Sequence, residues 1–205
     1  MISGVYRSRF TNVLKTIQEN SLIFILFALF LSGLVFGTII IKNDSLVVDR
    51  AVELVSTYIK FRGSQTVFET ACSSFITNLI HIIPIFIFGL CAVGIPATLS
   101  IPFVRGVGIG FISAFFYTTY GLNGLGHCIL VIFPGAMFSV LILILSSQIA
   151  TVSSANIFRR ITVGNTQEIK LIAYCKRFLV YFCGYIIIGL LDGILNKIFS
   201  NIFII

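Results

Sequence analysis

The chain has 205 residues, of which 58% are hydrophobic and only 10% are charged, and its mean hydropathy is +1.08. A soluble domain carries about 25% charged residues, and this chain has too few of them to give a folded surface polar cover. The composition excludes a soluble or secreted disulfide-bonded domain, a disordered chain and a nucleic-acid-binding protein. It predicts a protein that crosses the membrane several times, with its net charge of +7 gathered in cytoplasmic loops.

The first predicted span follows a polar N-terminal segment, residues 1–20. Residues 21–41 form a continuous apolar run, long enough to cross a hydrocarbon core about 30 Å thick as a helix. Residues 42–74 form the longest polar segment, in which apolar side chains recur at helical spacing. We therefore expect an amphipathic helix here, lying on the membrane or on a partner protein, with Arg50 and Glu53 as candidate partner contacts.

The middle of the chain carries almost no charge apart from Arg105, and bilayer thickness divides it into several spans. Pro96 and Pro102 predict a short turn near residues 96–106, and a group of glycines predicts another near residues 120–126. These breaks give three further spans, at about residues 75–96, 103–120 and 126–150.

A second polar segment, residues 151–177, carries a net charge of +4 and precedes a last span at residues 178–198. If the N-terminus is cytoplasmic, nine Lys and Arg residues lie inside, with Arg105 counted in its predicted turn, against five outside. Positively charged residues favour the cytoplasmic side. The sequence thus predicts a single all-α polytopic domain of five spans, oriented N-in and C-out.

The ionisable candidates at depth in the predicted spans are His81 and Asp192, and they are functional candidates for that reason. His81 has Asn78 one turn before it and Pro84 one turn after it, so it also suits a neutral ring donating to a carbonyl released by Pro84. Asp192 is the only acid within a predicted span. Both residues would lie near the outer leaflet, where a pair could form either a proton relay or a structural hydrogen bond, and we favour the hydrogen bond.

No arrangement of residues in the sequence indicates an enzyme. His127 follows the glycine-rich turn, but no Ser, Cys or acid has the spacing of a catalytic triad with it. The five cysteines show neither CxxC nor metal-ligand spacing, and we interpret them as packing residues. We therefore predict no catalytic residue, no metal and no cofactor.

Small residues four positions apart recur in three of the predicted spans, a pattern that lets helix backbones approach closely in lipid. The glycines after Arg105 also resemble a phosphate-binding loop, but no strand precedes them and no Lys-Ser/Thr follows. Tight packing explains all three pairs, either within one chain or between copies in a homo-oligomer. The candidate packing residues are Gly33, Gly37, Gly106, Gly110, Gly189 and Gly193.

Glycine and proline motifs in the middle of the chain, over about residues 75–155, suggest a family. In order, they are Phe88-Gly-Leu-Cys-Ala-Val-Gly-Ile-Pro96, Phe103-Val-Arg-Gly-Val-Gly-Ile-Gly-Phe111, Tyr120-Gly-Leu-Asn-Gly124 and Ile132-Phe-Pro-Gly135. This order resembles the stage II sporulation protein M family, five-helix membrane proteins of endospore-forming bacteria, or a close relative in the wider family.

The resemblance implies a non-enzymatic scaffold in the cell membrane that acts during engulfment. Family members are thought to gather peptidoglycan-degrading partners, similar to stage II sporulation proteins D and P, at the septal membrane. The expected partners are thus membrane lipid and wall hydrolases, and no nucleic acid. The alternative is a transporter component, such as an ABC exporter permease, whose basic segment 151–177 docks an ATPase.

Overall fold

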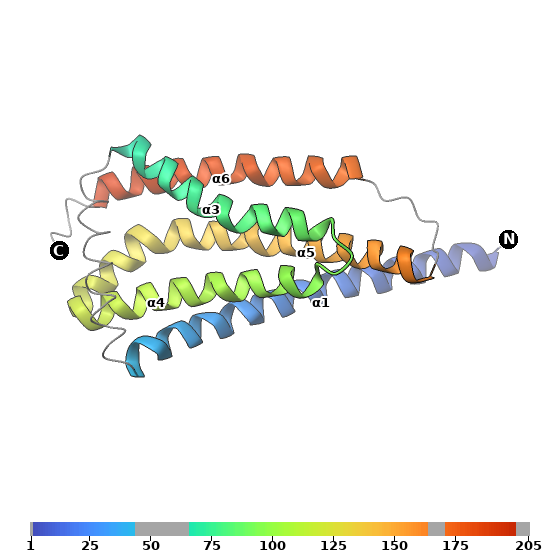
Figure 1. Ribbon diagram of the computed structural model, residues 1–205, viewed down its shortest axis with the longest axis horizontal. Helices are drawn as coiled ribbons and strands as arrows, with labels where there is room; N and C mark the ends of the chain where they lie inside the picture. Colours follow the sequence, from blue (N-terminus) through green and yellow to red (C-terminus); the bar gives the residue numbers. More distant parts are fainter. Residues whose placement is uncertain (1, 44–65, 164–170, 200–205) are drawn as a thin grey trace.

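The computed structural model describes residues 2–43, 66–163 and 171–199, and within these ranges the chain is helical, without a strand. The predicted all-α class is confirmed. Arg50 and Glu53, with the rest of residues 44–65, lie outside the described residues, as do residues 164–170. The helices are α1 (Ile2–Asn43), α3 (Val67–Gly89), α4 (Ile95–His127), α5 (Phe133–Val163) and α6 (Leu171–Phe199), and a π-helical stretch, η1 (Cys128–Ile132), joins α4 to α5 (Figure 1).

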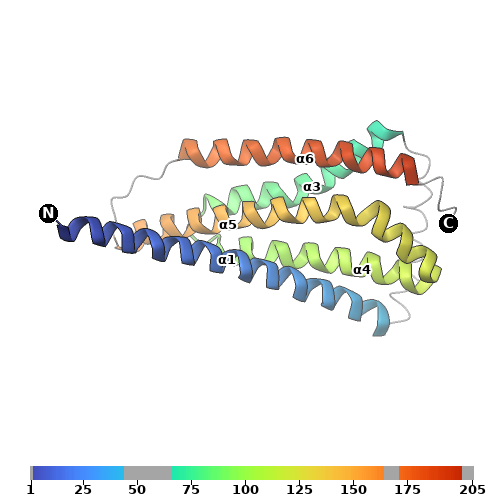
Figure 2. The same ribbon diagram turned by 180° about the vertical axis from the view of Figure 1, so that it is seen from behind.

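Five of the described helices are long and apolar enough to cross a membrane, which confirms a polytopic bundle of five spans. The helices run side by side, and α1 begins at one end of the bundle while α6 finishes at the other (Figures 1 and 2). The N-in and C-out orientation stays a prediction. The spans cover Ser21–Ile41, Val67–Gly89, Ile95–Gly121, Phe133–Thr162 and Leu171–Ile198.

Helix α3 begins eight residues before the predicted span because a capping box fixes its first turn. The side chain of Thr66 accepts from the Glu69 N–H, and the Glu69 carboxylate accepts from the Thr66 N–H at 2.7 Å. The break before α4 falls at residues 90–94 rather than 96–106. Pro96 occupies the first turn of α4, where a missing N–H costs no helical hydrogen bond, and α4 continues through Pro102.

Helix α4 is broken at Gly121, where the chain reverses; this residue has a φ of +59° that residues with a Cβ rarely adopt. This position falls in the predicted glycine-rich turn. Pro134 then follows the π-helical stretch η1. Its ring cannot donate a hydrogen bond and would clash with the Leu130 carbonyl, which explains why the helix loosens just before it.

Helix α5 is the centre of the bundle. Half of the residues in its apolar window are buried inside the protein, against 22–28% in the other four spans. Helices α3 and α6 lie on one side of α5, and α1 and α4 lie on the other (Figures 1 and 2). Helix α5 also continues to Val163 and α6 begins at Leu171, so most of the predicted 151–177 loop is helical.

Helices α1 and α4 touch backbone to backbone through glycines. A Cβ added at Gly106 would meet the Phe30 carbonyl and lie 3.0 Å from the Leu34 N, and one added at Gly37 would lie 2.9 Å from the Phe111 N. Each helix contributes two such glycines that fit against the other backbone, which is the close approach that small residues allow in lipid. The four glycines are Gly33, Gly37, Gly106 and Gly110.

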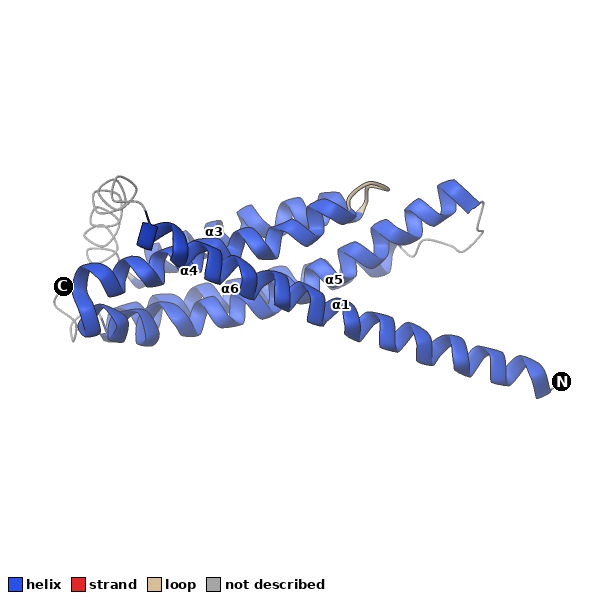
Figure 3. Cartoon of the chain, turned by 90° about the horizontal axis from the view of Figure 1, so that it is seen from below, coloured by secondary structure: helices blue, strands red, loops and turns tan. Residues whose placement is uncertain are grey.

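The same contacts fix the direction and register of this helix pair. Gly33 lies against Phe103 and Gly37 against Val107, so residue numbers rise together and the two helices are parallel. Extrapolated backward, these contacts place Ile95, the start of α4, within about one helical turn of Ser21, where the apolar run begins. Both helices thus enter the apolar layer at the same level, while the first turns of α1 extend beyond the other helices (Figure 3).

A second, looser small-residue contact joins α6 to the beginning of α3. A Cβ at Gly189 would lie 2.8 Å from the Ala71 carbonyl oxygen, and one at Gly193 would lie 2.5 Å from that of Val67. Numbers rise in one helix as they fall in the other, so α3 and α6 are antiparallel. All three glycine pairs singled out in the sequence therefore face another helix of the same chain.

We expect Gly106→Ala to lower the stability of the bundle, because the new methyl would push α1 away from α4. Overpacking of this kind costs about 1–3 kcal/mol. Gly108→Ala is the matched control, since no atom lies within 4 Å of its added Cβ, and Ala favours a helix by up to about 1 kcal/mol. Thermal unfolding in mild detergent should show a lower midpoint for the first variant only; equal midpoints would contradict the packing.

Candidate functional site

Arg105 lies inside the bundle and not in the turn where we counted it. It is the eleventh residue of α4, about 15 Å from the helix start at a rise of 1.5 Å per residue. With the start of α4 at the edge of a hydrocarbon core about 30 Å thick, Arg105 is close to mid-depth. Without it, the sequence still places eight Lys and Arg residues on the N-terminal side of the membrane, against five on the other.

Arg105 is held by hydrogen bonds to two other helices. Its Nη2 donates to Asn78 Oδ1 on α3 and to Ser139 Oγ on α5, each at 3.3 Å. The Ser139 hydroxyl also donates to Asn78 Oδ1 at 2.7 Å, which closes a triangle. Tyr185 on α6 donates to the Ser139 backbone carbonyl at 3.4 Å. We call these four residues the polar cluster.

The polar cluster joins four helices at the depth where polar groups are most expensive. Asn78, Ser139 and Tyr185 are buried, and an arginine at the centre of a membrane helix costs about 2.5–3.5 kcal/mol on insertion scales. The cost is offset only where the donors find acceptors. Asn78 Oδ1 is the shared acceptor, so it is the atom on which the geometry of the cluster depends.

His81 lies one turn from Asn78 on α3, and its Nδ1 is 2.8 Å from the Thr77 carbonyl oxygen. A carbonyl can only accept, so Nδ1 carries the proton in this contact. The acceptor is the carbonyl four residues before His81, and not that of Ile80, the one that Pro84 leaves without its helical donor.

Asp192 is too far from His81 to form the pair that the sequence allowed. Its carboxylate lies where a Cβ would stand at Gly135 on α5. Gly193, the next residue, lies against Val67 at the beginning of α3. His81 is fourteen residues further along α3, about 20 Å away. The two candidates therefore occupy different levels of the bundle.

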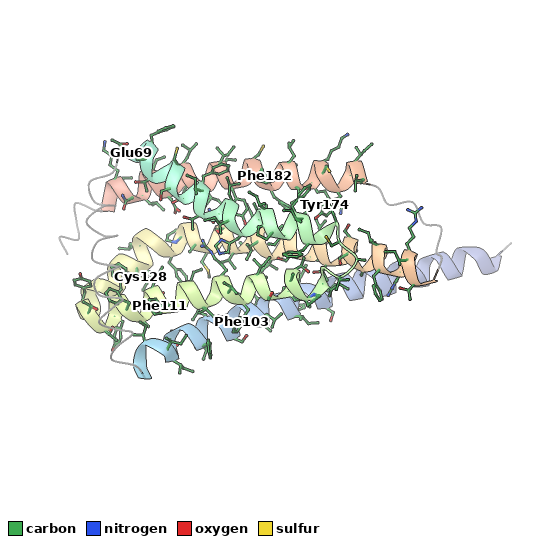
Figure 4. The ribbon with its side chains drawn as sticks, in the orientation of Figure 1. Glu69, Phe103, Phe111, Cys128, Tyr174 and Phe182 are labelled. Carbon is green, nitrogen blue, oxygen red and sulfur yellow. The ribbon has the colours of Figure 1, made fainter. Side chains whose placement is uncertain are left out.

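Further polar contacts join neighbouring helices near the end of the bundle where α3 stops. Thr98 and Thr151 share a hydroxyl–hydroxyl hydrogen bond of 2.9 Å, and the Ser154 hydroxyl donates to the Cys91 carbonyl at 2.7 Å. Tyr174 reaches from α6 toward α3, donating to the Phe86 carbonyl at 2.9 Å (Figure 4). Sequence reasoning missed these contacts, because a Ser or Thr in an apolar span does not indicate which helix it faces.

These polar groups hold neighbouring helices together through hydrogen bonds. Each hydrogen bond described above ends on a partner in the same chain, and most cross from one helix to another. Within the ranges that the structure describes, no three His, Cys, Asp or Glu side chains gather as metal ligands. The polar cluster fixes the relative positions of α3, α4, α5 and α6.

We expect Asn78→Ala to destabilise the bundle by about 1–3 kcal/mol, because Arg105 and Ser139 would lose their shared acceptor inside the membrane. Thr77→Ala is the control on the same helix turn: Thr77 is exposed, and its hydroxyl bonds only to the Ser73 carbonyl of its own helix. Denaturation by sodium dodecyl sulfate, followed by circular dichroism, would compare them. If both variants unfold like the wild type, the polar cluster does not stabilise the fold.

Comparison with known proteins places the chain in a family. The family model for stage II sporulation protein M matches residues 26–197, which include all five predicted spans apart from a few residues at the two ends. Searches of curated proteins and of solved structures found no match. The matched region contains the glycine contacts of α1 with α4 and the whole polar cluster. The chain belongs to the stage II sporulation protein M family.

Proposed function

We propose that this protein is a non-enzymatic membrane scaffold of sporulation. It anchors peptidoglycan-degrading partners, similar to stage II sporulation proteins D and P, and localises them at the septal membrane during engulfment. Family membership across residues 26–197 is the observation that carries this proposal. The family is not a known enzyme family, in keeping with a role in holding other proteins.

The geometry of the bundle supports a holding role. Polar side chains at mid-depth bond to one another across helices, and the α1–α4 contact has no room for an added atom. Interlocked packing of this kind favours one rigid arrangement over a set of alternating ones. A scaffold needs that property, because it must present its partners at fixed positions.

The partner contact is assigned to the predicted segment of residues 42–74, of which residues 42–66 lie between the first two spans. Under the N-in orientation this segment faces the wall, where hydrolases act. Its charges balance to zero, which suits contact with a protein better than contact with an anionic lipid surface. Arg50 and Glu53 are the residues that we expect to contact the partner.

A second candidate function is the membrane component of a transporter. The observation in its favour is Arg105, a charged side chain close to mid-depth that lies beside other polar groups, as in many substrate pathways. This function requires an ATPase bound on the cytoplasmic side. Its test is the identity of the proteins that accompany the chain from the membrane.

We expect the double charge reversal Arg50→Glu and Glu53→Arg to release the wall hydrolases while the protein stays in the membrane. Each side chain would then oppose the charge that it normally attracts. The measurement is affinity purification from cells entering sporulation, with mass spectrometry of the co-purified proteins. Lys197→Glu is the control, since Lys197 is exposed in the last turn of α6 on the same predicted side.

Unchanged recovery of hydrolases with the double reversal would remove residues 42–74 as the partner site. Recovery of an ATPase in place of hydrolases, from the wild-type protein, would support the transporter function and contradict the scaffold.

We also expect reporter fusions to place the N-terminus inside and the C-terminus outside. Alkaline phosphatase folds only outside the cytoplasm, so it should be active when fused after Ile205 and inactive when fused after Asn20, before the first span. The reverse pattern would put residues 42–74 in the cytoplasm, where they could not meet the wall.

A further inference from the structure

The net charge of the chain is concentrated at one end of the bundle. Segments at the end where α1 begins and α5 stops carry eight Lys and Arg residues against two acids, a net charge of +6. Segments at the opposite end, with Asp192 near the end of α6 counted among them, carry five of each, a net charge of zero. Apart from Arg105, the whole net charge of +7 therefore lies on one face of the membrane.

Among the residues whose side chains the structure describes, two pairs of basic residues lie at this end: Arg159 and Arg160 on α5, and Lys176 and Arg177 on α6. All four are exposed. None of them forms a hydrogen bond or an ion pair with a residue whose side chain the structure describes, so their charges are available to other partners. We call these four residues the basic end.

The two pairs approach the same level of the membrane from opposite directions. Ser154 contacts Cys91 in the turn between α3 and α4, so Arg159 and Arg160 lie about 8 Å beyond that turn. Helical side chains lean toward the start of their own helix. The two arginines therefore lean back toward the membrane, while Lys176 and Arg177, near the start of α6, lean out of it. Both pairs reach the headgroup layer.

Apolar side chains beside the basic pairs indicate that lipid, and not water, surrounds them. Ile161 is 72% exposed next to the arginine pair, and Ile172 is 75% exposed one turn before Lys176. Aliphatic side chains of this size are stabilised where acyl chains meet headgroups, and long basic side chains beside them extend to the phosphates. A soluble protein partner would leave these isoleucines in water wherever it did not cover them.

We propose that the basic end binds the phosphate groups of anionic phospholipids. The four side chains hold a shell of negatively charged lipid around the α5–α6 end of the bundle, and the neutral opposite end has no such preference. This inference does not depend on the scaffold function, because it rests on charge, exposure and depth alone.

The test uses the full-length protein in nanodiscs that contain phosphatidylglycerol and phosphatidylcholine in equal amounts. Native mass spectrometry then counts the lipids of each kind that stay bound. The basic-end variant is R159Q/R160Q/K176Q/R177Q. The matched control, K42Q/R50Q/K60Q/R62Q, removes four positive charges from the opposite end.

We expect the wild type and the control to retain phosphatidylglycerol over phosphatidylcholine. The basic-end variant should lose that preference by about tenfold, since each basic residue near the surface adds attraction to anionic lipid. High salt should weaken the preference of the wild type. The charge-conserving variant R159K/R160K/R177K should keep it, and equal thermal unfolding midpoints in neutral detergent would show that all variants fold.

Three results would overturn the proposal. The first is equal retention of the two lipids by the wild type, and the second is an equal loss of phosphatidylglycerol in the basic-end variant and the control. The third is a basic-end variant that keeps its phosphatidylglycerol but no longer co-purifies with an acidic cytoplasmic protein, which would assign these residues to a protein partner.

Discussion

Apolar burial cannot hold helices together inside a bilayer, because lipid chains are as apolar as the side chains that the helices would bury. The bundle must therefore be held by close packing and by hydrogen bonds between helices. It uses each of these in a different place. Helices α1 and α4 approach until their backbones touch at glycines, whereas α3, α4, α5 and α6 are joined at mid-depth through Arg105 and Asn78.

The glycine packing and the polar cluster both involve α4, which explains how the rest of the bundle is positioned. One face of α4 carries Gly106 and Gly110 against α1, and Arg105 beside them bonds to α3 and α5. A shift of α4 along α1 would move the guanidinium away from Asn78. The register of one helix pair thus determines whether the polar cluster can form, and a rigid bundle of this kind suits a protein proposed to hold others in place.

The sequence predicted the number of spans and the glycine positions because both depend on local patterns. An apolar run has to match the bilayer thickness, and small residues four apart form a face on any helix. It did not predict the place of Arg105. Pro96 is compatible either with a loop or with the first turn of a helix. Only the capping of the neighbouring segments decides which of the two forms. Once Arg105 was assigned to a turn, nothing in the pattern linked it to Asn78.

Contacts between residues far apart in the chain could not be predicted from the sequence either, for a physical reason. His81 and Asp192 share a predicted leaflet, but their separation depends on the length by which α3 and α6 overlap, and that length follows from Gly193 lying on Val67. Likewise, Thr98 and Thr151 are separated by 53 positions and bond only because α4 and α5 are antiparallel neighbours. The glycine faces are occupied within one chain, and packing between copies of the chain stays a prediction.

The most direct test of this account is cross-linking of α1 to α4 in native membranes. The rings of Phe36 and Phe103 lie 6.1 Å apart, so the pair Phe36→Cys and Phe103→Cys, in a cysteine-free background, should react with a short bismaleimide within one chain. Phe36→Cys with Val104→Cys, whose side chain is exposed on another face of α4, should not. Absence of a cross-link in the first pair, or a dimer in place of an internal link, would contradict the α1–α4 contact on which the bundle is built.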